Sequence, residues 1–334
     1  MKKRLLTAAL ALAMVGSMAF AAHADDAKYE IAVMVKGTDS DFWQQVLVGA
    51  LNFEVDHADE VHVTTYGPLS EADTAEQTQM MDDIVTSHPD AIVVAPTLYD
   101  NLSAGIDDAA AAGIPVAIID NMPSTDSYVA MFATDAQSAG AALGEKFVGE
   151  LEKRGVELKG KVGLISPMAG QDTVIKRETG FKEKLAELAP DIEVLEPIYT
   201  DNDIPKSLTA AEDIYTANPD DLIGYFCSNN ATGDGLAQFM TENNLGDKLV
   251  AVAFDSDAAE IEAVKSGALY AIAVQSPYNM GYQGCECVLS ILKGEKTADD
   301  FEKFNDTGIN LVDGENVNDP EMEGVLDPFT LKKY

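Results

Sequence analysis

The stretch YEIAVMVKGTDSDFWQQVLVGALNFEVD at residues 29–56 contains the first strand and helix signals of the chain. Its apolar run from Tyr29 to Val35 is typical of a buried strand, and Phe42 to Asp56 follows as a helix. Phe42 and Trp43, the single tryptophan, therefore stand at the carboxyl end of the strand, where open α/β sheets bind ligands. The alternative is that both rings only pack beneath the helix.

The same alternation of short apolar runs and helix-length segments continues along the chain. It is the pattern of βα units, which build mainly parallel sheets. The other predicted strands are residues 61–66, 91–95 and 116–120, then a second series at 161–166, 192–198, 222–228, 249–254 and 271–275. Because two such series exceed the usual size of one core, we predict an α/β fold of two similar, doubly wound parallel-sheet lobes.

Residues 1–24 have the three parts of a secretory signal peptide. Met1-Lys2-Lys3-Arg4 is basic, Leu5 to Ala21 is apolar, and Ala22-His23-Ala24 fits the cleavage site. We therefore expect cleavage after Ala24 and export to a Gram-negative periplasm. The whole chain has a formal charge of −35, and loss of the basic leader makes it more negative. Such a charge disfavours nucleic acid and anionic lipid as partners.

The three cysteines are too few for a disulfide framework. We expect Cys227, Cys285 and Cys287 to be buried as small apolar side chains. A strained bridge between Cys285 and Cys287 is the alternative, although side chains two positions apart on a helix point away from each other. No histidine lies near them in the sequence, so we predict no metal site and no cofactor.

Polar side chains end four of the predicted strands, namely Asp120, Asn229, Asp255 and Gln275. For any one of them, capping of the next helix is as good an explanation as ligand contact. Together with Phe42, Trp43 and Arg177 they suit an uncharged polyhydroxy ligand. Aromatic faces cover its C–H patches, while carboxylate, amide and guanidinium groups bond its hydroxyls.

These residues resemble the type I periplasmic solute-binding proteins, in the ribose-binding branch that serves sugar ABC transporters. The segments that carry the resemblance, in order, are IAVMVKGTDSDFWQQVLVGA at 31–50, AIVVAP at 91–96, GIPV at 113–116, RETGF at 177–181, VAFD at 252–255 and AVQ at 273–275. It implies that the sugar contacts Phe42, Trp43, Asp120, Asn121, Arg177, Asn229, Asp255 and Gln275, with Ser40 and Asn202 as further candidates.

Three positions depart from the pattern of the ribose binders. Ser40 stands where an Asn is expected, Asn121 replaces an Arg, and Asn202 replaces an aromatic residue. The loss of one Arg and one ring counts against ribose, and the predicted ligand is a monosaccharide or a sugar alcohol.

The resemblance also implies three hinge crossings between the lobes, near residues 134–135, 275–276 and 307–308. We place the lobes at residues 25–134 plus 276–306 for the N-terminal lobe, and 135–275 plus 307–334 for the C-terminal lobe and a surface tail. Ligand would close the hinge, and the closed form would present both lobes to the permease of an ABC transporter in the inner membrane. We expect a monomer.

Other classes of function fit the sequence less well. His57, His62 and His88 lie near no nucleophile motif, and neither G-x-S-x-G nor a phosphate loop occurs, so we predict no enzyme. A regulator of the lactose-repressor type needs a helix-turn-helix where the signal peptide stands. A periplasmic sugar sensor that reports to a chemoreceptor or kinase stays open as an alternative. The acidic run 201–203 lacks the Gly and Glu of a calcium loop.

Overall fold

Strand β1 (Tyr29–Met34) and helix α1 (Asp41–Asp56) form where the first apolar run and the segment after it predict them. The strand is fully buried from Ile31 onward, as expected for a strand covered on both faces of a parallel sheet. The structure is a computed structural model that describes residues 28–334. The predicted signal peptide therefore lies outside the described residues.

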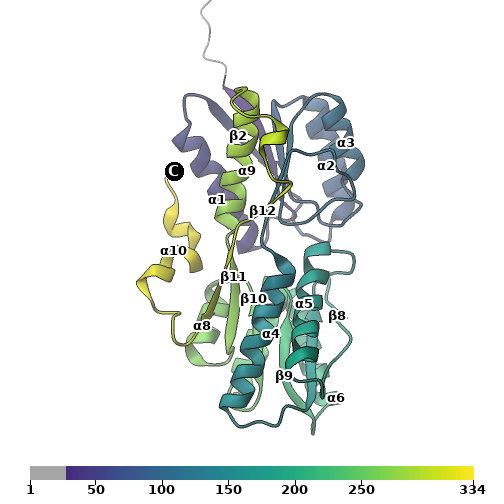
Figure 1. Ribbon diagram of the computed structural model, residues 1–334, viewed down its shortest axis with the longest axis vertical. Coiled ribbons are helices and arrows are strands. Elements are labelled where there is room, and N and C mark those ends of the chain that lie inside the picture. The colour runs from purple at the N-terminus through teal and green to yellow at the C-terminus, as the bar shows by residue number, and fades with distance from the viewer. Residues whose placement is uncertain (1–27) are drawn as a thin grey trace, which may run out of the picture.

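The N-terminal lobe is built on a six-stranded parallel sheet with the order β12-β5-β4-β3-β1-β2. Its further strands are β2 (Val61–Tyr66), β3 (Ala91–Val94), β4 (Val116–Ile119), β5 (Met131–Ala133) and β12 (Phe304–Asp306). Helices α1 and α9 (Pro277–Leu292) cover one face, and α2 (Thr74–Ser87) and α3 (Ser103–Ala111) cover the other (Figure 1). Alternate residues of each strand point to opposite faces of the sheet and pack against the helices there. Because both faces are covered, the strands are apolar throughout.

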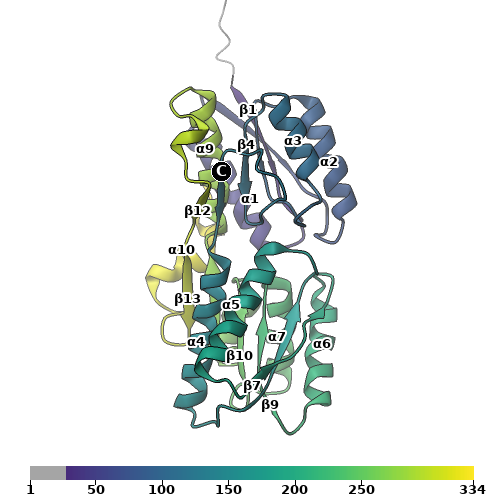
Figure 2. The same ribbon diagram turned by 45° about the vertical axis from the view of Figure 1, so that its right-hand side comes forward.

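The C-terminal lobe has a seven-stranded sheet with the order β13-β11-β10-β9-β6-β7, and β8 pairs with β6. Its strands are β6 (Gly160–Ser166), β7 (Ile192–Val194), β8 (Ile198–Tyr199), β9 (Leu222–Cys227), β10 (Val250–Phe254), β11 (Ala271–Gln275) and the antiparallel β13 (Ile309–Asp313). Helices α4 (Ala136–Lys153) and α5 (Asp172–Leu188) cover one face. The other face carries α6 (Ile204–Ala217), α7 (Asn230–Glu242) and α8 (Ala258–Ser266) (Figure 2). The predicted class of two doubly wound lobes is confirmed.

The structure differs from the predicted strands in two respects. The single strand expected at residues 192–198 is two short strands, β7 and β8, which pair with different parts of β6. Strands β5, β12 and β13 were not predicted, because they lie in segments that were interpreted as lobe crossings or tail. Strands β5 and β12 have only three residues each, and β13 pairs antiparallel with β11, so the predicted series of βα units includes none of them.

The chain passes between the lobes three times, at residues 134–135, at 276 and at 307–308. The first and third crossings are tied together, because the Asp306 carboxylate accepts hydrogen bonds from the backbone N–H groups of Asp135 and Gly308, at 3.1 and 2.9 Å. Gly308 has a φ of 82°, which a glycine adopts without strain. The three predicted crossings are thus confirmed as part of the fold.

The C-terminal tail also bridges the two lobes. It was predicted to belong with the C-terminal lobe, and Leu326 at the end of helix α10 (Glu323–Leu326) does pack in that core. The last residues instead lie on helix α1 of the other lobe. The buried Asn52 side chain donates to the Leu331 carbonyl at 2.7 Å and accepts from the Lys333 N–H at 2.9 Å. Figure 1 shows this yellow segment running alongside both lobes.

Replacing Asn52 with Ala is expected to lower the free energy of unfolding by about 1–3 kcal/mol, because a buried side chain loses two partly buried hydrogen bonds to the backbone of the tail. Urea unfolding followed by circular dichroism measures the change. The control is Gln238→Ala, which removes an exposed amide from helix α7 and should change stability by less than about 0.5 kcal/mol. Equal effects of the two substitutions would contradict the role of Asn52 as an anchor.

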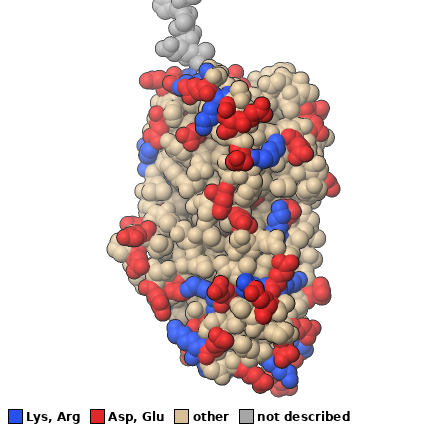
Figure 3. All heavy atoms as spheres, viewed as in Figure 1, with Lys and Arg blue, Asp and Glu red and all other residues tan. Residues whose placement is uncertain are grey.

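The charge of the surface and the burial of the cysteines agree with the predictions from the sequence. Figure 3 shows acidic side chains distributed over both lobes, with fewer basic ones among them. Cys227, Cys285 and Cys287 are buried and free, as predicted, and burial raises the pKa of all three thiols. Among residues 28–334, no helix has both the length and the hydropathy of a membrane span.

Candidate functional site

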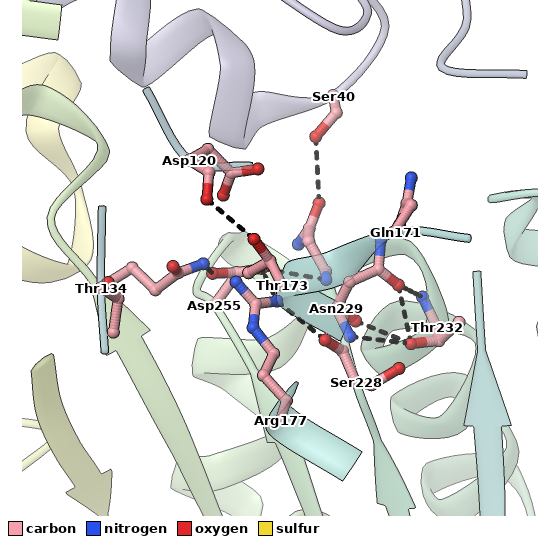
Figure 4. Close-up of polar contacts among 12 residues, drawn as sticks. Ser40, Asp120, Thr134, Gln171, Thr173, Arg177, Ser228, Asn229, Thr232 and Asp255 are labelled. Carbon is pink, nitrogen blue, oxygen red and sulfur yellow. Dashed lines mark hydrogen bonds and ion pairs between the residues drawn. The ribbon is translucent and has the colours of Figure 1, made fainter. Parts of the chain in front are cut away.

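The carboxyl ends of the two sheets face each other across a cleft. Residues that directly follow strands of both lobes contribute to it, which explains how positions far apart in the sequence meet. The cleft is lined by Lys36, Ser40, Phe42, Trp43, Glu71, Asp120, Gln171, Thr173, Val174, Arg177, Asn229, Asn230, Asp255 and Gln275. Figure 4 shows Ser40 and Asp120 on one side, with Arg177, Asn229 and Asp255 on the other.

Eight of the ten candidates from the sequence are part of this lining, namely Ser40, Phe42, Trp43, Asp120, Arg177, Asn229, Asp255 and Gln275. Asn121 and Asn202 are not. Asn121 is fully buried between the lobes, and Asn202 accepts a hydrogen bond from the Asn229 amide at 2.6 Å. Neither residue lines the cleft, but Asn202 is bonded to Asn229, which does.

The aromatic pair belongs both to the cleft and to the core. The Phe42 and Trp43 rings meet edge to face, with centroids 4.8 Å apart, and both pack against the N-terminal sheet. The Trp43 indole N–H donates to Glu71 Oε1 at 2.6 Å. The structure therefore shows the packing beneath the helix and also places both rings in the lining of the cleft.

Two charged residues of the cleft, Lys36 and Glu71, were missed by the sequence analysis. Lys36 Nζ lies 2.6 Å from Asp120 Oδ2 and 5.4 Å from the centroid of the Trp43 ring. Lys36 directly follows the first apolar run. The search for polar residues at strand ends, which identified Asp120, could therefore have identified Lys36 as well. Glu71 stands in the loop after β2 and has no such signal.

Glu71 is buried in the cleft and connects the lobes. Its carboxylate accepts from Trp43 of its own lobe and from the Gln171 amide of the C-terminal lobe, the latter at 3.2 Å. Burial raises the pKa of the Glu71 carboxyl, while the nearby Lys36 charge and these hydrogen bonds oppose the rise. The side chain thus fixes the orientation of the indole.

In the C-terminal lobe, Arg177, Asp255 and Gln275 form one buried group. Gln275 donates to Asp255 Oδ1 at 2.7 Å, and Arg177 Nη1 lies 4.0 Å from Asp255 Oδ2. Burial raises the pKa of the Asp255 carboxyl, and the Arg177 charge opposes this. Arg177 Nε and Gln275 Oε1 have no hydrogen-bond partner among residues 28–334. Buried polar atoms are normally paired, so these two atoms are available to a ligand.

The strand-end residues divide between capping and the cleft. Asn229 caps helix α7 through a capping box with Thr232, as the capping alternative expects. Asp255 does not cap helix α8, since that role belongs to Asp257. Asp120 and Asp255 have φ values of 61° and 77°. Left-handed backbone at such residues costs about 1–3 kcal/mol and is concentrated at ligand sites.

Helix α5 carries Arg177 into the cleft, and its position depends on helix α4. The two helices meet at a pair of glycines. A Cβ at Gly140 would stand 2.0 Å from the Arg177 carbonyl oxygen, and one at Gly180 would stand 2.0 Å from that of Gln137. Only glycine permits this approach, so the helix contact sets the position of the Arg177 side chain.

Comparison with known proteins identifies the family. Residues 31–296 match the model of a family described as a periplasmic binding protein domain. The chain belongs to this family of periplasmic binding proteins. The resemblance stated from the sequence, to type I solute-binding proteins of the ribose-binding branch, is confirmed.

Among its relatives, a ribose import binding protein of Salmonella typhimurium is 26% identical, over 88% of this chain and 94% of that protein. A carbohydrate transporter solute-binding protein from Agrobacterium radiobacter, solved with D-arabinose, is 33% identical with a TM-score of 0.84, over 90% of this chain and 99% of that one. An ABC transporter solute-binding protein from Agrobacterium vitis, solved with D-fucose, is 35% identical with a TM-score of 0.81, over 89% and 99%.

The lobes of this periplasmic binding protein are in direct contact across the cleft. Thr173 of helix α5 donates its backbone N–H to Asn121 Oδ1 at 3.0 Å and its hydroxyl to the Asp120 carbonyl at 2.8 Å. Ser40 Oγ donates to Asn230 Oδ1 at 3.4 Å. These contacts are those of a closed arrangement, and Asn121 is one of the residues that hold the lobes together.

Proposed function

We propose that the protein captures a neutral monosaccharide or sugar alcohol between its lobes and delivers it to the permease of an ABC importer. The observation that carries the proposal is the chemistry of the cleft lining. Two aromatic rings, three buried carboxylates and the unpartnered Arg177 Nε and Gln275 Oε1 surround one space. This combination suits a ligand with C–H faces and several hydroxyls.

The charges of the cleft favour an uncharged ligand. Lys36 is paired with Asp120, and Arg177 lies against Asp255, so each buried cation has a carboxylate partner. A sugar phosphate or a sugar acid would have to compete with these carboxylates for the same cations. Neutral hydroxyls instead bond to the paired groups without separating them.

The relatives favour import over the sensory alternative. The relatives described above match nearly the whole chain. One is a ribose import binding protein, and two are solute-binding proteins of transporters that were solved with a bound sugar. We infer a periplasmic location, in keeping with the signal peptide predicted at residues 1–24, and a monomer that binds its ligand without catalysis. Closure around the sugar then links occupancy to the surface that the permease contacts.

Titration of the single Trp43 tests the proposal. A panel of D-arabinose, D-fucose, D-ribose, D-xylose, tagatose and a sugar alcohol is expected to include one ligand that changes the indole fluorescence saturably. The reason is that Trp43 lines the cleft and is bonded to Glu71. The same ligand should raise the melting temperature, since it binds only the folded protein.

Charged analogues supply the control for this titration. A sugar phosphate and a sugar acid of the same configuration should leave both the fluorescence and the melting temperature unchanged. If the protein binds them as tightly as the neutral sugar, the argument from paired charges is wrong. If no sugar or sugar alcohol shifts either signal, the proposed ligand class is wrong.

A further inference from the structure

A second group of acidic side chains lies beside the cleft, on helices α7 and α8. Oxygens of Asp234, Asp257 and Glu260 all lie within 4.8 Å of one another. Asp234 is in helix α7, while Asp257 caps helix α8 and Glu260 stands in its first turn. None of the three belongs to the lining of the sugar cleft, so the group needs an explanation of its own.

Two of the three carboxyls share one side-chain hydrogen-bond donor, Asn230 of helix α7. The Asn230 amide donates to Asp257 Oδ2 and to Glu260 Oε2, at 3.1 Å each. Asp257 Oδ1 accepts from two backbone N–H groups of helix α8. In the described part of the chain, no Lys or Arg forms an ion pair with any of the three. Their negative charge is therefore not balanced by protein.

Two carboxylate oxygens of the group have no partner at all among residues 28–334. They are Glu260 Oε1 and Asp234 Oδ1. Glu260 is 0% exposed and Asp234 is 8% exposed. Glu260 Oε1 packs directly over Gly233, where a Cβ would stand only 2.0 Å from it. Burial of a carboxylate oxygen without a hydrogen-bond partner is costly. Gly233 leaves space for the Glu260 Oε1 atom, but no group in the described residues forms a hydrogen bond with it.

Protons or a cation could neutralise this group. Glu260 Oε1 accepts no hydrogen bond from any donor in the described residues. A cation would use the same oxygen as a ligand.

We propose that Asp234, Asp257 and Glu260 bind one divalent cation, and that this cation is Ca²⁺. Oxygen ligands select hard cations. Ca²⁺ binds oxygen at about 2.3–2.6 Å, so its ligands stand up to about 5 Å apart, whereas Mg²⁺ requires a tighter octahedron. Three oxygens that all lie within 4.8 Å of one another can bind a common Ca²⁺ ion.

The site is open to an ion from solvent and is shared with the other lobe. Asp234 and Asp257 line an open pocket, and Asp39 and Asp41 of the N-terminal lobe line the same pocket. The negative charge of Asp257 contributes to a raised pKa of Asp41, after the larger contribution of burial. A bound cation would therefore also reduce repulsion between the lobes, since acidic residues of both lobes face it.

Calorimetric titration of the full-length secreted protein with CaCl₂, after EDTA treatment and without sugar, tests the site. We expect saturable binding of one Ca²⁺ and a rise in melting temperature of at least about 3 °C at saturation. Glu260→Gln should weaken CaCl₂ binding at least tenfold. Its metal-free melting temperature should not fall, because the amide keeps the shape and removes a buried charge.

The matched control is Glu262→Gln, an exposed acid on the same helix, which should bind CaCl₂ like the parent protein. Asp234→Asn is the second variant and should lose binding as Glu260→Gln does. The proposal is overturned if CaCl₂ up to about 10 mM does not bind, since the weakest extracellular sites have a Kd of about 1 mM, or if Glu262→Gln loses as much affinity. Tighter binding of MgCl₂ overturns the choice of ion. Because no sugar is present, failure here leaves the proposed sugar function untouched.

Discussion

Asp255→Asn is expected to weaken sugar binding by about 1.5–3 kcal/mol, the range for a hydrogen bond to a charged group, or roughly ten- to a hundredfold in Kd. Asp255 is 6% exposed and accepts from the Gln275 amide and from the Asn230 N–H, at 2.7 and 3.2 Å. The asparagine keeps the shape but gives up the charge and one acceptor oxygen, which leaves Arg177 without its carboxylate partner. Calorimetric titration with the sugar found by Trp43 fluorescence measures the loss.

Asp82→Asn is the control for the loss of one negative charge. Asp82 is exposed on helix α2, outside the cleft, so its variant should bind sugar like the parent protein. Circular dichroism of both variants shows whether the fold is kept. Parent-like affinity in Asp255→Asn would remove Asp255 from the proposed site.

Gly140→Ala is expected to lower the free energy of unfolding by about 1–3 kcal/mol, as overpacking of a close contact does. The added methyl would stand 2.0 Å from the Arg177 carbonyl oxygen, so helices α4 and α5 must separate. Because helix α5 carries Arg177, sugar affinity should fall as well, although Gly140 itself does not line the cleft. Urea unfolding and sugar titration measure the two effects.

Gly149→Ala makes the same substitution in the same helix and should have the opposite sign. Gly149 is exposed, and no atom beyond its own stretch of helix lies within 4 Å of the added Cβ. Alanine is favoured over glycine inside a helix by roughly 0.5–1 kcal/mol. Stabilisation by both substitutions would show that helices α4 and α5 do not approach as closely as the structure has them.

The sequence was most informative where a signal is local. Long buried strands such as β1 and β9 are continuous apolar runs, and the helices between them are long enough to be distinguished from strands. Strands β5, β12 and β13 were missed, because they lie beside the lobe crossings or in the tail, outside the predicted series of βα units. Asn121 was assigned by analogy to the sugar, whereas its amide is used by Thr173 to hold the lobes together.

The sequence by itself determined the two series of βα units and the polar residues at strand ends, because periodicity and order along the chain are enough to show them. Only the tertiary structure decided which of these residues meet. The pairing of Lys36 with Asp120 joins the ends of two strands, and the last residues of the tail reach back to Asn52 on the first helix. The group of Asp234, Asp257 and Glu260 forms because helices α7 and α8 pack side by side. Such contacts depend on the distance between segments in the fold, which spacing along the sequence does not contain.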